Sequence, residues 1–154
     1  MPSFTVVGLP DNAVKESRER VTSAIKNSGY PFPQGKVTIN LAPADIRKEG
    51  SSFDLPMAIA ILAANGYIST DRLADFVFIG ELGLDGTVAS ARGVLPMAIS
   101  TREEGIPNII VPAENVREAA VVGIDAYPVE KLQDVIDIIE GKSPISPYRL
   151  DIKE

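Results

Sequence analysis

The chain has 154 residues, of which 45% are hydrophobic and 23% charged, with a net charge of −6. This length and composition predict one soluble globular domain. Cysteine and histidine are both absent, which excludes a disulfide framework, a thiolate metal site and a Ser-His-Asp triad. The acidic balance disfavours a free-standing nucleic-acid binder. No apolar run is long enough for a membrane span and no signal-peptide pattern opens the chain, so the expected location is the cytoplasm.

The first half of the chain is predicted to contain a strand, an amphipathic helix, a second strand, a loop and a buried helix, in that order, at 3–8, 11–28, 36–41, 42–52 and 54–64. The helix predicted over 54–64 is the central element of this half of the chain. No residue from Met57 to Ala64 is polar, so this helix has no face suited to water and must be buried on several sides. Asp54 is placed to act as its N-cap.

The second half of the chain alternates short strands and helices. It is predicted to contain a helical turn, two strands, a helix, a strand, a helix, a strand and a helix, at 71–75, 76–84, 87–90, 94–104, 108–111, 113–121, 124–127 and 129–140. Asp85-Gly86 between the first two strands predicts a hairpin. The order indicates one α/β (α+β) domain over 2–141, with a mixed sheet covered by helices. The Pro- and charge-rich tail, 142–154, is interpreted as a linker.

Standard cofactor motifs are absent. Nothing matches a P-loop or a dinucleotide-binding fingerprint. Four scattered carboxylates are candidate metal ligands: Glu49, Asp54, Glu81 and Asp85. Three of them have simpler roles, as a solvated loop residue, a helix cap and a hairpin turn, and no metal site is predicted.

The serine pair Ser51-Ser52 is the remaining candidate for chemistry. Without histidine, a hydroxyl nucleophile needs a lysine whose pKa is lowered by burial. Gly50 and the two serines precede a helix N-terminus, whose backbone N–H groups suit an oxyanion or another anion. The alternative is structural: small residues are placed here because the backbone turns tightly and serine shares helix capping with Asp54.

Three long segments carry a family resemblance: VVGLPDNAVKESRERVTSAIKNSGYPFP, INLAPADIRKEGSSFDLPMAIAILAANG and GELGLDGTVASARGVLPMAI, at 6–33, 39–66 and 80–99. They resemble the N-terminal module of the bacterial ComM/YifB family, which is related to magnesium chelatase. The resemblance implies the fold of the Lon proteolytic domain, in a superfamily named after a ribosomal protein domain. It also implies that an AAA+ ATPase module, absent from this chain, follows the tail and binds ATP and magnesium. The full-length protein would then be a ring-forming, ATP-dependent DNA branch-migration motor.

The likeness to Lon can be followed residue by residue. Lon proteases carry Lys-Asp-Gly-Pro-Ser-Ala-Gly around the nucleophile, and Ser52 falls at that position, followed by bulky Phe53 and acidic Asp54. The Lon lysine follows a Gly-Gly-apolar turn, and Leu95 occupies its position. Arg92 cannot replace that lysine as a base, because a guanidinium stays protonated. The resemblance therefore implies an inherited fold with a broken catalytic dyad.

The expected function is a non-catalytic accessory domain that contacts its own AAA+ module and sister subunits in a ring. Two alternatives stay open. One is a serine peptidase that uses Lys36 or Lys48 as its base. The other is a nucleic-acid or anion-binding module, with DNA reached through the full-length protein. Its candidate contacts are Arg47, Lys48, Gly50, Ser51, Ser52 and Asp54, to which Lys15, Arg18 and Arg20 could be joined. No cofactor is expected in this chain. A missing upstream strand would leave a sheet edge open, which predicts a homodimer of the fragment.

Overall fold

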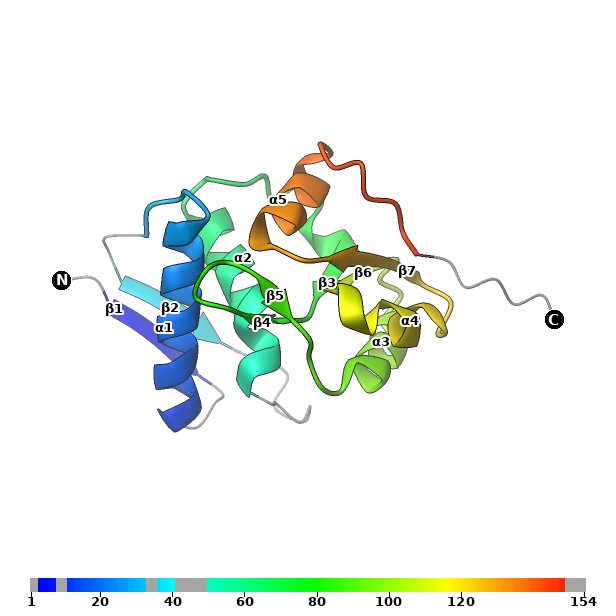
Figure 1. Cartoon of the computed structure of the whole chain (residues 1–154), viewed down its shortest axis with the longest axis horizontal. Coiled ribbons are helices and arrows are strands. Elements are labelled where there is room, and N and C mark those ends of the chain that lie inside the picture. Colours follow the sequence, from blue (N-terminus) through cyan, green and yellow to red (C-terminus); the bar gives the residue numbers. More distant parts are fainter. Residues whose placement is uncertain (1–2, 8–10, 33–35, 41–49, 149–154) are drawn as a thin grey trace.

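The structure, a computed structural model, describes residues 3–7, 11–32, 36–40 and 50–148 (Figure 1). Within these ranges it has the predicted mixed α/β fold. The strands are β1 Ser3–Val7, β2 Lys36–Asn40, β3 Phe76–Phe78, β4 Glu81–Leu82, β5 Val88–Ala89, β6 Asn108–Pro112 and β7 Asp125–Val129. The α-helices are α1 Asp11–Asn27, α2 Asp54–Ala64, α3 Val94–Glu103, α4 Val116–Ala120 and α5 Leu132–Glu140. Three short 3-10 turns are η1 Gly50–Phe53, η2 Leu73–Asp75 and η3 Ala113–Asn115.

The described strands form three small sheets. β1 and β2 are parallel, with Ser3 opposite Lys36. β3, β6 and β7 form a parallel sheet in the order β3-β6-β7, and β4 and β5 form an antiparallel pair. In Figure 1, α1 and α2 lie beside β1 and β2, α3 and α4 lie together at the other end of the molecule, and the β4–β5 pair lies between these groups.

Helix α2 is buried on several sides, as its sequence predicts. Leu55, Met57, Ala58, Ile61 and Leu62 are each at most 2% exposed. The main hydrophobic cluster joins α2 to buried residues of α1, β3, β7 and α5. The helix therefore forms the centre of the fold, and burial of its aliphatic side chains is a large part of what stabilises the chain.

The predicted strand over 76–84 is wrong in its continuity, because the chain leaves one sheet and enters another at Ile79-Gly80. Ile79 still donates its N–H to the carbonyl of Ile110 on β6 (3.0 Å), whereas Gly80 donates to the carbonyl of Ser52 (3.1 Å). A Cβ at Gly80 would lie 2.8 Å from Cγ1 of Val88. Glycine therefore permits the close approach that redirects the strand.

The hairpin predicted at Asp85-Gly86 is confirmed. Glu81 pairs with Ala89 and Leu82 with Val88, and Gly86 has a φ of +93°, a left-handed conformation that glycine adopts without steric cost. Oδ1 of Asp85 accepts hydrogen bonds from the backbone N–H (3.1 Å) and the hydroxyl (2.8 Å) of Thr87. These bonds lower the pKa of the Asp85 carboxyl.

Several boundaries in the second half differ from the sequence prediction. The helix predicted over 113–121 is divided between η3 and α4, and the one predicted from Val129 starts at Leu132, because Val129 ends β7. Asp134 caps the start of α5 by accepting hydrogen bonds from the N–H groups of Glu130 and Lys131. In the predicted linker, Ile145 packs on the main core and Tyr148 donates its N–H to the carbonyl of Ala126 (2.7 Å). The boundary at 141 stays a prediction.

No helix in the described ranges combines the length and the hydropathy that crossing a membrane would require.

Candidate functional site

The turn that carries Ser52 is held against the redirected strand by two backbone hydrogen bonds. Gly80 donates to the carbonyl of Ser52 (3.1 Å), and Leu55 donates to the carbonyl of Gly80 (3.0 Å). Because both polar groups of Gly80 are used, η1 and the start of α2 are fixed to the end of β3. The position of Ser52 is thus set by the core rather than by a free loop.

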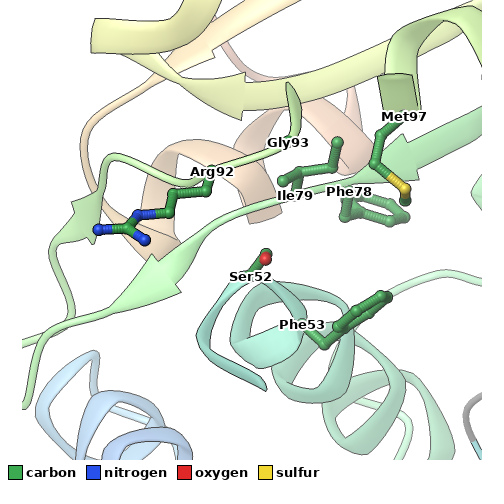
Figure 2. A pocket seen from close by; sticks show the side chains of 7 residues that line it. All are labelled: Ser52, Phe53, Phe78, Ile79, Arg92, Gly93 and Met97. Atoms are coloured by element: carbon green, nitrogen blue, oxygen red, sulfur yellow. The ribbon is translucent and has the colours of Figure 1, made fainter. Parts of the chain in front are cut away.

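Ser52 borders a small, mainly apolar pocket of about 40 Å³. Its lining residues come from η1, the end of β3 and the start of α3, and they are Ser52, Phe53, Phe78, Ile79, Arg92, Gly93 and Met97. Figure 2 shows the side chain of Ser52 pointing up toward the gap between these segments. Phe78 and Met97 lie to one side of Ser52, whereas the Arg92 side chain runs to the other and its guanidinium points away from them.

The two segments that the Lon comparison aligns with the nucleophile and lysine motifs therefore meet in space. Ser52 and the Arg92-Gly93 turn line the same pocket. Gly93 has a φ of +75°, precedes α3, and offers that helix no side-chain cap. Leu95, which the resemblance places at the Lon lysine position, does not line the pocket and is 39% exposed.

Few of the described residues that line the pocket have polar side chains. Its polar side chains are the Ser52 hydroxyl and the Arg92 guanidinium. A guanidinium stays protonated and cannot accept the proton of a serine hydroxyl. Among the described lining residues there is no lysine, histidine or carboxylate to serve as the base.

Asp54 has a different role from the N-cap predicted for it. It is the first residue of α2, Phe53 occupies the capping position, and the Asp54 side chain is fully buried. Its carboxylate accepts hydrogen bonds from Nε of Arg20 (2.6 Å), Nη2 of Arg20 (3.1 Å) and the N–H of Leu82 (3.1 Å). Ser17 accepts a further bond from Nη2 of Arg20 (3.1 Å). The carboxylate thus joins α1, α2 and β4, and a buried side chain cannot contact a partner directly.

The electrostatics of this pair follow from its burial. Desolvation raises the pKa of the Asp54 carboxyl above its ordinary value, while the hydrogen bond from Arg20 and the backbone bond from Leu82 oppose that rise. The hydrogen bond with Asp54 raises the pKa of Arg20. The ion pair therefore compensates a buried charge and is weak evidence for net stabilisation.

The other predicted contact residues are only partly placed. Arg47, Lys48 and Glu49 lie outside the described residues, and Gly50 and Ser51 are described as backbone of η1 alone. On α1, Lys15 and Arg18 are exposed, whereas Arg20 is engaged by Asp54. In the described ranges, no three acidic side chains gather where they could share a metal ion.

Sequence reasoning missed two features of this site. Phe78 and Met97, which line the pocket, were not singled out, because hydrophobic patterning cannot separate a pocket wall from a core. The partner of Asp54, Arg20, lies 34 positions earlier. The signal that could have found this pair is the place of Arg20 next to the apolar stripe of an amphipathic helix, where a charged side chain needs a partner.

The mixed α/β fold is like that of the proteolytic domain of Lon, and Ser52 is the residue that the resemblance places at the nucleophile position. Lon protease 2 of Bacillus subtilis is 28% identical over 144 residues, covering 91% of this chain and 26% of the protease.

The chain belongs to the family described as subunit ChlI of Mg-chelatase, whose model matches residues 1–115. YifB of Escherichia coli is 47% identical over 146 residues, covering 92% of this chain and 28% of YifB. The competence protein ComM of Haemophilus influenzae is 40% identical over 154 residues, covering 99% of this chain and 30% of ComM. The chain thus spans about three tenths of the length of these curated relatives.

Proposed function

We propose that this chain is a non-catalytic accessory domain of an ATPase related to magnesium chelatase, with a fold inherited from a protease-like ancestor. The family match supports the link to the ATPase, and the shortness of the match relative to YifB and ComM supports a role as one module of a longer protein. In the longer protein the domain contacts the ATPase module and neighbouring subunits of a ring. That protein would act as an ATP-dependent DNA branch-migration motor in the cytoplasm, with ATP and magnesium bound by the ATPase module.

One observation carries the proposal. Ser52 stands at the Lon nucleophile position, but its described surroundings are Phe53, Phe78, Ile79 and Met97, with Arg92 beyond. An apolar environment disfavours ionisation of a hydroxyl, and the residue at the Lon lysine position, Leu95, cannot act as a base. These described surroundings support the proposal that the fold is kept without the catalytic chemistry.

The competing peptidase hypothesis makes Lys36 or Lys48 the base, so it predicts a reactive Ser52. We expect no covalent labelling of the chain by a fluorophosphonate probe, because an unactivated serine hydroxyl is a poor nucleophile. Intact-mass spectrometry after incubation is the measurement. The matched control is Ser52→Ala. Labelling of the wild-type chain that disappears in Ser52→Ala would establish a peptidase-like site and refute the proposal.

A DNA-binding role for the isolated domain is the weaker alternative. With a net charge of −6 and Arg20 committed to Asp54, we expect no retention of the chain on immobilised duplex DNA even at low salt, about 50 mM, because nonspecific affinity rests on phosphate neutralisation. Retention that decreases steeply with salt and is abolished by charge reversal at Arg47 and Lys48 would contradict this expectation. Reversal at Arg117, an exposed residue of α4, is the matched control.

A further inference from the structure

A further pocket lies between the start of η2, β7 and the segment that follows α5, and its volume is about 170 Å³. Six residues line it: Arg72, Tyr127, Ile138, Gly141, Ser143 and Ile145. In Figure 1 the segment after α5 runs from the end of that helix back toward β7, where the N–H of Tyr148 donates to the carbonyl of Ala126 (2.7 Å). One wall of the pocket is therefore a segment that hydrogen bonding holds against the sheet.

Arg72 supplies the charge of this pocket, and two contacts hold its guanidinium in place. Nη1 donates to the carbonyl of Ile138 (3.4 Å), and Cζ lies 5.4 Å from the centroid of the Phe76 ring. A guanidinium has five N–H donors, and no acidic side chain in the described ranges forms an ion pair with this one. Donors thus remain available to a ligand while the group stays oriented.

The other side chains that line the pocket add hydroxyl groups and no negative charge. Oγ of Ser143 accepts a hydrogen bond from the N–H of Ile145 (3.0 Å), so its own hydrogen is available for donation. The Tyr127 ring packs on Phe76, with the two centroids 6.0 Å apart, and its hydroxyl can donate or accept. None of the six lining residues is acidic. The pocket therefore offers one positive charge together with two hydroxyl groups.

These features favour a small carboxylate over a phosphate. One guanidinium pairs with one carboxylate through two parallel hydrogen bonds. A phosphate group carries up to about two negative charges at pH 7, and neither a lysine nor a second arginine is among the six lining residues to balance the second charge. The volume of about 170 Å³ is close to the roughly 150 Å³ of a cavity that holds benzene, so a free acid of about seven non-hydrogen atoms has the right size.

We propose that this pocket binds a small free hydroxy acid. Its carboxylate pairs with Arg72, its hydroxyl bonds to those of Tyr127 and Ser143, and its short carbon chain packs against Ile145. The inference goes beyond the proposed function and does not depend on the chemistry of Ser52, because the two pockets share no lining residue.

The test uses the whole chain, labelled with ¹⁵N, and 3-hydroxybutyrate as the probe. We expect saturable shifts of the amide signals of Arg72, Ser143 and Ile145, with a dissociation constant of about 1 mM for so small a ligand. The neutral amide of the same acid, 3-hydroxybutyramide, is expected not to bind, because it lacks the charge. Inorganic phosphate is expected to bind at least about tenfold more weakly, because its second charge is not balanced.

Two variants isolate the charge and one hydroxyl group. Arg72→Gln keeps a polar side chain and is expected to weaken binding of 3-hydroxybutyrate about tenfold. Its matched control, Arg102→Gln, changes an exposed arginine of α3 outside the pocket and should leave the dissociation constant unchanged. Tyr127→Phe keeps the ring and is expected to weaken binding about threefold, whereas Tyr67→Phe, at a residue 41% exposed, should have no effect. The amide spectra also report whether each variant is folded.

The outcomes are distinct from those of the fluorophosphonate experiment. Binding that needs Arg72, the carboxylate and the Tyr127 hydroxyl supports the inference. Absence of shifts, tighter binding of phosphate than of 3-hydroxybutyrate, or equal effects of Arg72→Gln and Arg102→Gln overturns the site and leaves the proposed function standing. Labelling of Ser52 by the fluorophosphonate refutes the proposed function and leaves this site standing.

Discussion

Replacing Arg20 with alanine is expected to destabilise the chain by about 3–5 kcal/mol near pH 7, because it leaves the fully buried Asp54 carboxylate without its ionic partner. The loss depends on pH in a defined direction. The folded-state pKa of Asp54 is raised, so between the unfolded and folded pKa values the folded state holds more protons. Stability from this group is then present below the unfolded pKa and falls as pH rises through the folded pKa. Removing Arg20 raises the folded-state pKa of Asp54 further and so widens the pH range over which stability falls.

The measurement is urea unfolding of wild type and Arg20→Ala at pH 7 and at pH 5. At each pH the free energy of unfolding of the variant is subtracted from that of wild type, so that the titration of other carboxylates cancels. We expect the difference to be smaller at pH 5. Arg18→Ala, at an exposed position of the same helix, is the matched control and should stay within about 0.5 kcal/mol of wild type. Adding Asp54→Asn to Arg20→Ala should recover part of the loss, since no charge remains buried. Equal differences at both pH values would contradict the expectation.

Replacing Leu62 with alanine is expected to lower the free energy of unfolding by about 2–5 kcal/mol, as a large-to-small change in a packed core does. Leu62 is 0% exposed on α2, within the cluster that joins α1, α2, β3, β7 and α5. Shared packing prevents the neighbours from closing the cavity by the movement of a single element. Denaturant unfolding followed by circular dichroism is the measurement.

The same substitution at an exposed leucine separates burial from composition. Leu84 in the hairpin is 51% exposed, and Leu84→Ala is expected to change the free energy of unfolding by no more than about 0.5 kcal/mol. Similar losses for the two variants would show that α2 is not the centre of the core.

The helices and strands were predictable from the sequence wherever a single hydrophobic pattern runs through the whole element. The alternation of 36–41 predicts the strand found at β2, and the apolar run of α2 predicts a helix buried on several sides. The break at Gly80 was missed, although a glycine inside a strand pattern can mark one. The structural reason for it is a distant side chain, Val88, whose Cγ1 lies 2.8 Å from where a Cβ would stand. Asp54 was misplaced as a cap for a similar reason, since Arg20 competes for its carboxylate from another helix.

The site was predictable only in outline. The resemblance to Lon brought Ser52 and the Arg92-Gly93 turn together, and both line one pocket. Neither pattern nor composition indicated that Phe78 and Met97 leave a space there, because the volume of a pocket depends on how far side chains from separate elements fall short of contact.

The β4–β5 hairpin has a consequence for how the chain unfolds. Its turn accepts a hydrogen bond at Leu84 from the side chain of Asn27 at the end of α1 (2.7 Å). On its other side, Leu132 donates to Gly86 (2.8 Å) and Val88 to Glu130 (2.8 Å). The hairpin, with only two residues in each strand, thus connects α1 to α5 through hydrogen bonds. A parallel pair of strands covered by a helix is a local unit that can open separately. Because the hairpin is hydrogen-bonded to both α1 and the start of α5, opening of either end of the molecule breaks contacts of the other. The hairpin therefore favours a single cooperative transition over stepwise melting of the two ends.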